Sequence, residues 1–304
     1  MSETFPTPLL YYCFRRPEHT RLTLESIAHN AEAKYSRLFI FIDGPKREGD
    51  EALGDEVEKI ARSRQWCGAV EIFRRKENLG CARSVIAGLD EFTDRFGTAA
   101  VLEDDNLLSQ YFLRYLGEAL KRYADEPRVM EVSGYRYPVS GIAPRSGFFC
   151  NCMQWGWGTW KRAWSNYERD GTKLLAQIEN STALTRRFNV ENSFPYLEYL
   201  RNQVAGRIGG WDIRWQATML LNDGLTLFPA HSLSRNVGFD GSGTNCTSAD
   251  VGFDSELWQY PIDDWPVSIE EDIQYRAAAA RYFRALRGSL PERIVRRIKR
   301  FAGV

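Results

Sequence analysis

The sequence predicts an α/β protein with a mostly parallel sheet and helices on both faces. Four apolar segments of strand length occupy residues 8–13, 38–42, 70–73 and 99–102. Segments with helical spacing separate them, and this alternation is typical of parallel sheets with right-handed crossovers. Polar or charged residues directly follow every one of these strands. Because open α/β sheets bind ligands beyond the carboxyl ends of their strands, we expect the functional site at this edge.

Local signals justify the individual elements of the first half. Pro17 begins a helix that continues past Ile27, since proline is favoured in the first helical turn. The Asp-Gly-Pro sequence at 43–45 ends the second strand in a turn. Apolar residues recur at helical spacing around 57–61 and over 82–96, which predicts the next two helices.

Composition limits the possible function classes. The 304 residues are 43% hydrophobic and 13% aromatic, enough for one large core or two joined subdomains. Forty basic side chains balance forty acidic ones, so no global field favours nucleic acid as a partner. The six cysteines contain no pair of CxxC motifs, which argues against structural zinc and a dense disulfide framework. Cys150 and Cys152 are either a redox pair or buried thiols, and buried thiols are favoured.

The expected location is the cytoplasm, because the N-terminus has no leader and no apolar run approaches the roughly 20 residues of a membrane span. Residues 281–304 contain eight Lys and Arg and one acid, Glu292. A capping box at 289–292 and helical spacing beyond it predict a basic amphipathic helix. This helix would either contact anionic lipid at the inner face of the plasma membrane or dock on the catalytic domain with its arginines in water.

The strongest single signal is the triplet Glu103, Asp104 and Asp105 at the end of the fourth apolar run. Three adjacent carboxylates repel one another unless a cation lies among them. Carboxylate oxygens suit Mg²⁺ or Mn²⁺, which commonly carry a phosphorylated ligand. The triplet therefore predicts metal-assisted chemistry on a nucleotide diphosphate, with a solvated loop that caps the next helix as the alternative.

Seven segments together resemble one enzyme family. They are LYYCFRRPEHT (10–20), FIFIDGPK (39–46), NLGCARS (78–84), VLEDD (101–105), QWGWGTW (154–160), WDIRW (211–215) and NVGFDGSGTNC (236–246). Their order and spacing resemble bacterial GT-A glycosyltransferases, family-2-like enzymes related to N-acetylglucosaminyltransferase I. The resemblance implies a GT-A fold, with a Rossmann-like, mostly parallel sheet followed by C-terminal helices.

On the donor side the resemblance implies a role for each strand-end residue. Asp105 would bind Mn²⁺ or Mg²⁺ directly, and Glu103 and Asp104 would contact ribose, donor sugar or metal-bound water. The remaining nucleotide contacts would be Arg16 at the phosphates, Asp43 at the uracil ring and Arg83 at phosphate or base. The alternatives are a surface-exposed side chain for Arg16, ordinary turn chemistry for Asp43 and a salt bridge on the helix face for Arg83.

Transfer with inversion needs a base for the acceptor hydroxyl. Asp212 is the first candidate, and a role as helix cap is its alternative. Relatives often carry an acid a few positions earlier, where this chain has Gly209 and Gly210. Asp240 is the second candidate, in a Gly/Ser-rich loop at 238–244 that has the composition of a lid.

Gln154 and Trp155 are candidate sugar contacts, because an aromatic face can stack on a sugar ring. Trp160 and Trp164 are four residues apart and are expected to pack inward from one helix. His231 is either a further metal ligand or, as favoured here, a structural hydrogen-bonding residue.

The predicted organisation is a nucleotide-sugar-binding half (1–150), an acceptor-binding half of the same domain (151–265) and a basic helical tail (266–304). The predicted function is metal-dependent, inverting transfer of a sugar, GlcNAc or a related hexose, from a UDP-sugar. The acceptor would be a glycan or lipid-linked sugar in bacterial surface polysaccharide synthesis. A sugar-phosphate nucleotidyltransferase and a non-catalytic glycan-binding module are the alternatives.

Overall fold

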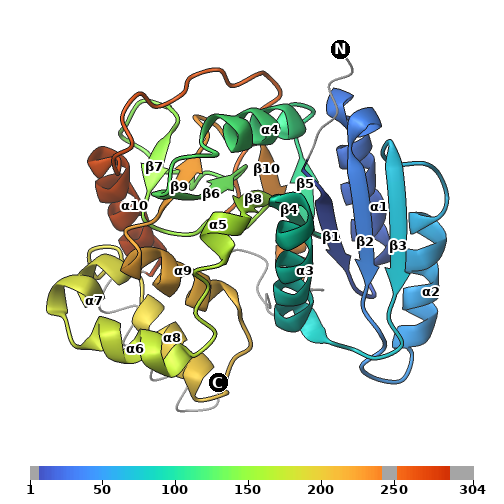
Figure 1. Ribbon diagram of the computed structural model, residues 1–304, viewed down its shortest axis with the longest axis horizontal. Helices are drawn as coiled ribbons and strands as arrows, with labels where there is room; N and C mark the ends of the chain where they lie inside the picture. The colour runs from blue at the N-terminus through green and yellow to red at the C-terminus, as the bar shows by residue number, and fades with distance from the viewer. Residues whose placement is uncertain (1–6, 242–251, 288–304) are drawn as a thin grey trace.

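The computed structural model describes residues 7–241 and 252–287, and its centre is an eight-stranded sheet (Figure 1). The strand order is β3-β2-β1-β4-β8-β6-β9-β7, and β5 and β10 form a separate two-stranded sheet. The strands are β1 (Leu9–Cys13), β2 (Arg37–Ile42), β3 (Ala69–Arg74), β4 (Thr98–Glu103), β5 (Asn106–Leu108), β6 (Val129–Ser133), β7 (Gly147–Phe149), β8 (Trp157–Trp160), β9 (Leu225–Phe228) and β10 (Ser234–Asn236).

The helices cover both faces of this sheet. They are α1 (Pro17–Ala28), α2 (Asp50–Ala61), α3 (Gly80–Phe96), α4 (Phe112–Arg122), α5 (Lys161–Trp164), α6 (Gly171–Glu179), α7 (Thr182–Phe188), α8 (Tyr196–Val204), α9 (Asp212–Leu221) and α10 (Ile273–Leu286), with the short 3-10 turns η1 (Ala31–Tyr35) and η2 (Gly238–Asp240). The predicted α/β class is therefore confirmed, and the first four strands and three helices match their expected ranges within one or two residues at most ends.

Four strands, β3, β2, β1 and β4, run parallel at one side of the sheet. Beyond β4 the sheet is mixed, because β8 pairs antiparallel with both β4 and β6, and β7 pairs antiparallel with β9. Alternation along β1 separates two cores. Leu9 and Tyr11 face the cluster that contains α1 and α2, whereas Leu10 and Tyr12 face the cluster that contains α3 and α5. The alternation explains why these strands are apolar throughout.

The second half contains two departures from the sequence prediction. Trp160 ends β8, and α5 is a single turn that begins at the next residue, so the expectation that Trp160 and Trp164 share a helix is wrong. Both side chains are buried, as expected. The small sheet of β5 and β10 was not predicted, and it brings Asn236 opposite Asn106.

The beginning of the predicted tail is part of the core. Helix α10 buries Tyr275 and Phe283 against a third cluster that includes Tyr137 and Phe228. The basic helix predicted beyond it, from residue 288 onward, lies outside the described residues. Within the described ranges, no helix is both long and apolar enough to cross a membrane.

Candidate functional site

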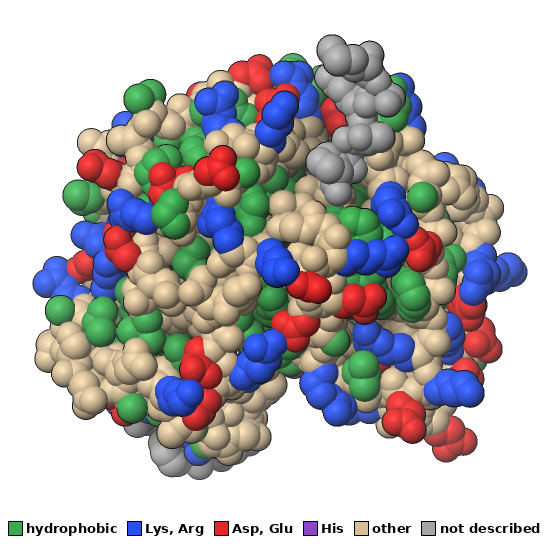
Figure 2. Space-filling view, viewed as in Figure 1, with side chains coloured by type: hydrophobic (Ala, Val, Ile, Leu, Met, Phe, Trp, Pro, Cys, Tyr) green, Lys and Arg blue, Asp and Glu red, His purple; other side chains and the backbone are tan. Residues whose placement is uncertain are grey.

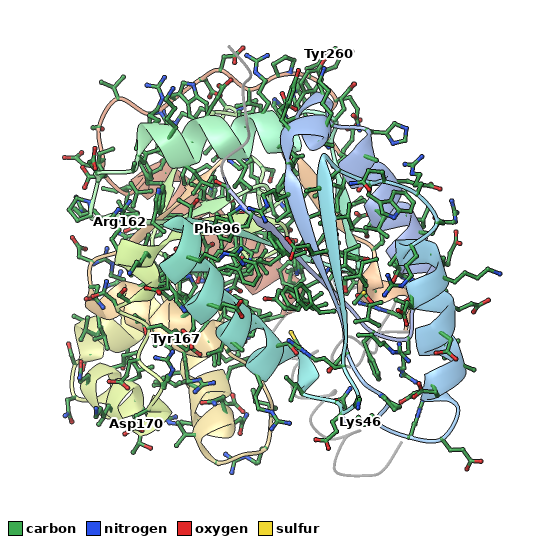
Figure 3. The ribbon with its side chains drawn as sticks, turned by 45° about the vertical axis from the view of Figure 1, so that its right-hand side comes forward. Lys46, Phe96, Arg162, Tyr167, Asp170 and Tyr260 are labelled. Carbon is green, nitrogen blue, oxygen red and sulfur yellow. The ribbon has the colours of Figure 1, made fainter. Side chains whose placement is uncertain are left out.

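The candidate site lies where β1, β2 and β4 end. Their carboxyl ends are in register, with Cys13 opposite Ile42 and Tyr12 opposite Glu103. In Figure 2 the surface is notched at its lower edge, between the part that contains α6–α8 and the part that contains α2 and α3. The loop after β2, marked by Lys46 in Figure 3, lies at this end of the molecule, and Tyr260 lies at the opposite end.

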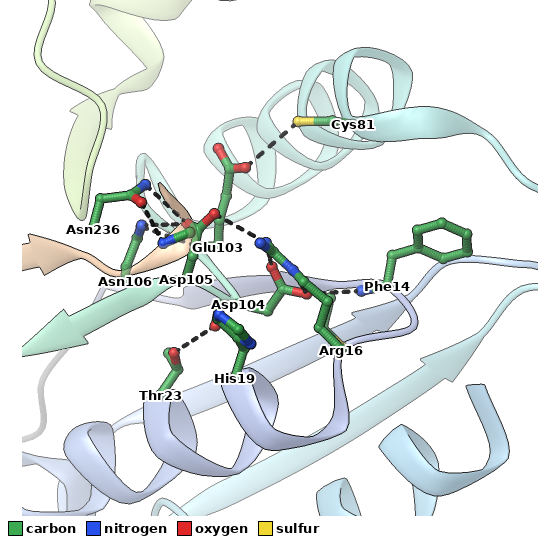
Figure 4. Close-up of polar contacts among 12 residues, drawn as sticks. Phe14, Arg16, His19, Thr23, Cys81, Glu103, Asp104, Asp105, Asn106 and Asn236 are labelled. Atoms are coloured by element: carbon green, nitrogen blue, oxygen red, sulfur yellow. Dashed lines mark hydrogen bonds and ion pairs between the residues drawn. The ribbon is translucent and has the colours of Figure 1, made fainter. Parts of the chain in front are cut away.

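Asp104 links the acidic triplet to the loop after β1 (Figure 4). Its carboxylate accepts hydrogen bonds from the Phe14 backbone N–H (3.2 Å) and from Arg16 Nε (3.2 Å), and Arg16 Nη2 contacts its other oxygen. Thr23 of α1 donates to the Asp104 carbonyl (2.8 Å). The bidentate pair orients the Arg16 guanidinium, whose Nη1 is buried without a hydrogen-bond partner among the described residues.

Asp105 is held by amide side chains and by the same arginine. Its Oδ1 accepts from Asn106 Nδ2 (2.9 Å) and Asn236 Nδ2 (3.2 Å), and its Oδ2 accepts from Arg16 Nη2 (2.9 Å). An added Cβ at Gly238 would overlap Asp105 Oδ2, so a glycine is required at this close approach. The predicted metal ligand is therefore held by both strands of the small sheet and by the loop after β1.

Glu103 points toward α3, where Cys81 Sγ lies 3.8 Å from its Oε2 (Figure 4). Burial and, to a lesser extent, the neighbouring charges of Asp105, Asp104 and Asp212 together raise the pKa of Glu103 to about 8, although Arg16 acts to lower it. The site thus contains more negative charge than its one guanidinium balances.

Asp212 reaches this cluster from α9. It is the first residue of that helix. The residue at the N-cap position, Trp211, makes no side-chain hydrogen bond, whereas the Asp212 carboxylate accepts from the Ile213 backbone N–H of the first turn, a contact that suits the alternative role at the helix start. Its side chain is exposed, yet surrounding protein raises its pKa by desolvation, a combination typical of a carboxylate in a concave surface. Its charge raises the pKa of both Glu103 and the Cys81 thiol, which places it near the acidic triplet. An added Cβ at Gly210 would lie 2.7 Å from Asp212 Oδ1.

Asp43 organises the loop that begins α3. Its carboxylate accepts hydrogen bonds from the backbone N–H groups of Leu79 (2.9 Å) and Gly80 (2.8 Å), and Arg75 Nη1 lies 3.9 Å from it. Asp43 therefore satisfies the first amides of α3 from a neighbouring strand. Gly80, which bonds Asp43, is directly followed by Cys81, which contacts Glu103. The start of α3 therefore connects Asp43 to Glu103.

The structure does not bring Arg83 to the acids. This exposed side chain donates to the carbonyls of Leu79 (2.8 Å) and Asn78 (3.4 Å), and with the described residues it does not form the salt bridge that was its alternative role. Gln154 Nε2 is buried without a hydrogen-bond partner among the described residues. Trp155 is half-buried, with ring contacts to Tyr135 (4.5 Å), Phe239 (5.5 Å) and Phe253 (6.0 Å). Its ring belongs to an aromatic cluster, and the predicted sugar contact stays a prediction.

His231 and Asp240, the remaining predicted residues, lie in different places. His231 stacks on Trp258 at 3.9 Å, and the charges that act on it belong to Arg136, Asp264 and Glu256. The contact that the structure shows for His231 is this ring stack, and the hydrogen-bonding role favoured above stays a prediction. Asp240 ends η2 and forms an ion pair with His19 of α1 (3.3 Å), on the side of the site that carries Arg16. The rest of its Gly/Ser-rich loop lies outside the described residues.

Three residues of the site have no role that the sequence predicted: Asn106, Asn236 and Arg75. Asn106 follows the acids directly, and its Oδ1 also accepts from the Glu103 N–H (3.1 Å). Asn236 is the first residue of a segment that carries the family resemblance. The sequence did not indicate that this segment pairs with β5. Arg75 follows β3, but the sequence does not distinguish it from Arg74, which pairs with acids of α2 instead.

No protein-family model matches the chain, and no curated protein sequence matches it. Among solved structures, a mannosyltransferase from Pyrobaculum calidifontis in complex with GDP-Man and Mn²⁺ aligns with TM-score 0.43 and 12% identity over 72% of this chain and 69% of that one. TarS residues 1–349 from S. aureus align with TM-score 0.42 and 7% identity over 75% and 59% of the two chains. Both TM-scores are below 0.5, so neither similarity alone assigns a function.

Proposed function

We propose that this chain is a metal-dependent glycosyltransferase that moves a sugar from a UDP-sugar to an acceptor hydroxyl with inversion. The observation that carries the proposal is that carboxylates from two different elements act on one another. Glu103, Asp104 and Asp105 come from the end of β4, and the accessible Asp212 comes from α9 and acts electrostatically on Glu103. Such a pair of sites suits a leaving group on one side and an attacking hydroxyl on the other.

The donor site would hold a nucleoside diphosphate. Arg16 supports this assignment, because buried N–H groups normally have acceptors and its Nη1 has none among the described residues. A diphosphate oxygen would supply one. Asp43 retains lone pairs beyond the backbone bonds it accepts and is proposed to meet the uracil N–H. Gln154 Nε2 is a second buried donor that has no acceptor in the described part of the chain, and it is proposed to contact the donor sugar.

The donor set fits Mn²⁺ or Mg²⁺. These ions take one or two protein carboxylates and complete their shell with phosphate oxygens and water. No three His, Cys, Asp or Glu side chains of the described ranges are arranged as a complete metal site, as expected if the substrate supplies the remaining ligands. Asp105 would be the direct ligand, since Asn106 and Asn236 fix its orientation. When bound, the ion would neutralise charge on the departing diphosphate.

Asp212 is proposed as the general base. Its raised pKa makes it a stronger proton acceptor than an ordinary aspartate while the side chain remains accessible to an acceptor hydroxyl. Asp240 is the weaker candidate, because its carboxylate is paired with His19.

The finer specificity rests on the sequence resemblance. We propose UDP-GlcNAc or a related UDP-hexose as donor and a glycan or lipid-linked sugar of a bacterial surface polysaccharide as acceptor. The enzyme would work in the cytoplasm, where the basic C-terminal helix would bring it to the inner membrane face.

A nucleotide-sugar screen tests the function. The protein is incubated with Mn²⁺ and UDP-GlcNAc, UDP-glucose, UDP-galactose or GDP-mannose, and nucleotide release is measured. We expect release of UDP, and Asp212→Asn should lower it about 100-fold because a general base contributes at least that factor. Asp223→Asn, at the other end of α9, is the matched control and should retain activity. Absence of release from every donor, or full activity in Asp212→Asn, would contradict the proposal.

A further inference from the structure

Glu131 is a fully buried carboxylate in the middle of β6 that the proposed mechanism does not use. Its Oε1 accepts hydrogen bonds from the Met153 backbone N–H (2.7 Å) and Thr226 Oγ1 (3.2 Å). Its Oε2 accepts from Trp215 Nε1 (2.8 Å). No Lys, Arg or His forms an ion pair with it in the described part of the chain. Burial raises its pKa to about 7, so this carboxylate costs free energy of folding.

The three donors come from separate parts of the acceptor half. Met153 precedes Gln154 and the segment that enters β8, Thr226 belongs to β9, and Trp215 belongs to α9. Trp215 is three residues after Asp212, so both lie on neighbouring positions of the first turns of that helix. Glu131 thus joins the sugar-contact segment to the helix that carries the proposed base.

An irregularity in the pairing of β6 with β9 supports a specific placement of the Glu131 side chain. The pairing of β6 with β9 shifts between Val129 and Glu131, so that two steps along β6 match one step from Leu225 to Thr226. Such bulges redirect side chains and occur beside active sites. Here the bulge sets Glu131 opposite Thr226, to which it also bonds.

The chemistry requires a carboxylate at this position. Two N–H donors, from Met153 and Trp215, each need an acceptor oxygen, and a glutamate has two. Glutamine has one acceptor oxygen, so in either orientation of its amide one buried N–H would lose its partner.

We propose that Glu131 is a positioning residue that fixes the first turns of α9, and through them Asp212, against the segment Met153–Trp157. The inference rests on the proposed function. A second contact between the same parts lies nearby, where the Trp157 ring stacks on Trp211 at 5.3 Å.

Three variants distinguish a positioning role of Glu131 from a role limited to accepting hydrogen bonds from buried donors. Glu131→Gln removes one acceptor and sets its own NH2 group against the Trp215 N–H. Trp215→Phe removes the α9 donor, and the double variant removes this opposition of donors while the link to α9 stays absent. Thr159→Val is the control, because it removes a buried hydroxyl that bonds the Met130 carbonyl and not Glu131. Each is measured for UDP release from UDP-GlcNAc with Mn²⁺ and water as acceptor, and for amide hydrogen exchange.

We expect kcat to fall about 100-fold in Glu131→Gln and in Trp215→Phe, as small misplacements of a catalytic group do, with KM for UDP-GlcNAc unchanged. The double variant should recover thermal stability relative to Glu131→Gln but should not recover kcat. Exchange at 212–216 should increase about tenfold in the variants without the link, with no change in α3. Thr159→Val should keep the kcat and the exchange at 212–216 of the wild type.

Recovery of kcat together with stability in the double variant would show that Glu131 only satisfies buried donors. Unchanged exchange at 212–216 in Glu131→Gln would also overturn the proposal. If the wild type releases no UDP from UDP-GlcNAc, the choice of donor or the proposed function fails, whereas the exchange measurement still decides whether Glu131 holds α9.

Discussion

At the residue scale, the position of the Asp105 carboxylate depends on contacts with the side chains around it. Asp105 is oriented by two asparagines and one arginine and is in close contact with Gly238. Any side chain at 238 would displace the carboxylate or the η2 turn, and metal affinity is sensitive to such shifts.

Gly238→Ala is therefore expected to weaken Mn²⁺-dependent UDP binding at least about tenfold, which corresponds to roughly 1.4 kcal/mol. Calorimetric titration of UDP in the presence of Mn²⁺ measures this change. Gly209→Ala is the control, because an added Cβ there meets no atom within 4 Å. Equal affinities of the two variants would show that the close approach at 238 is unimportant.

An apolar run that ends in three acids predicted a metal site at 103–105, whereas the individual roles of Asp105 and Asp43 were implied only by the family resemblance. The sequence could not assign His231, whose ring stacks on Trp258, or Trp155, whose ring packs with Phe239 and Phe253. These contacts join segments that are not neighbours in sequence, and no local pattern specifies them.

At the element scale, α3 depends on a residue that is not part of it. Its own N-cap, Leu79, makes no side-chain hydrogen bond, and Asp43 at the end of β2 accepts from the first amides instead. Strand–helix alternation was sufficient to predict β2 and α3. This capping contact spans more than 30 residues and was not predictable from local spacing.

Asp43→Ala should destabilise the fold by about 1–2 kcal/mol, the usual cost of losing a helix cap. Urea unfolding measures the difference in free energy. Asp170→Ala, which removes the cap of the peripheral α6, is the comparison. We expect only Asp43→Ala to lose UDP binding as well, and retained UDP affinity in that variant would argue against its nucleotide role.

At the scale of the whole molecule, the buried Glu131 contributes to the pH dependence of stability. Glu131 has an ordinary pKa of 4.5 when unfolded and a pKa of about 7 when folded. Between these values the folded protein binds more protons than the unfolded chain, so the contribution of Glu131 to stability falls as pH rises through this window.

Glu131→Gln should reduce the loss of unfolding free energy between pH 5 and pH 8 by up to about 3 kcal/mol relative to the wild type. Urea unfolding at several pH values checks this. Glu103, Asp104 and Asp212 also have raised pKa values, and they remain in both proteins, so the difference isolates Glu131. Parallel pH profiles would contradict the prediction.

The central claim is that the acidic triplet binds a metal ion together with a nucleoside diphosphate. The most direct test is the melting temperature with UDP, with Mn²⁺ and with both, in the wild type, in Asp105→Asn and in the control Asp94→Asn, an exposed acid that pairs with Lys161. At ligand concentrations near 100 times Kd, binding stabilises the folded state by about 2.7 kcal/mol. The wild type and Asp94→Asn should show a UDP shift that requires Mn²⁺, and Asp105→Asn should lack it. An equal shift in Asp105→Asn, or no Mn²⁺-dependent shift in the wild type, would contradict the claim.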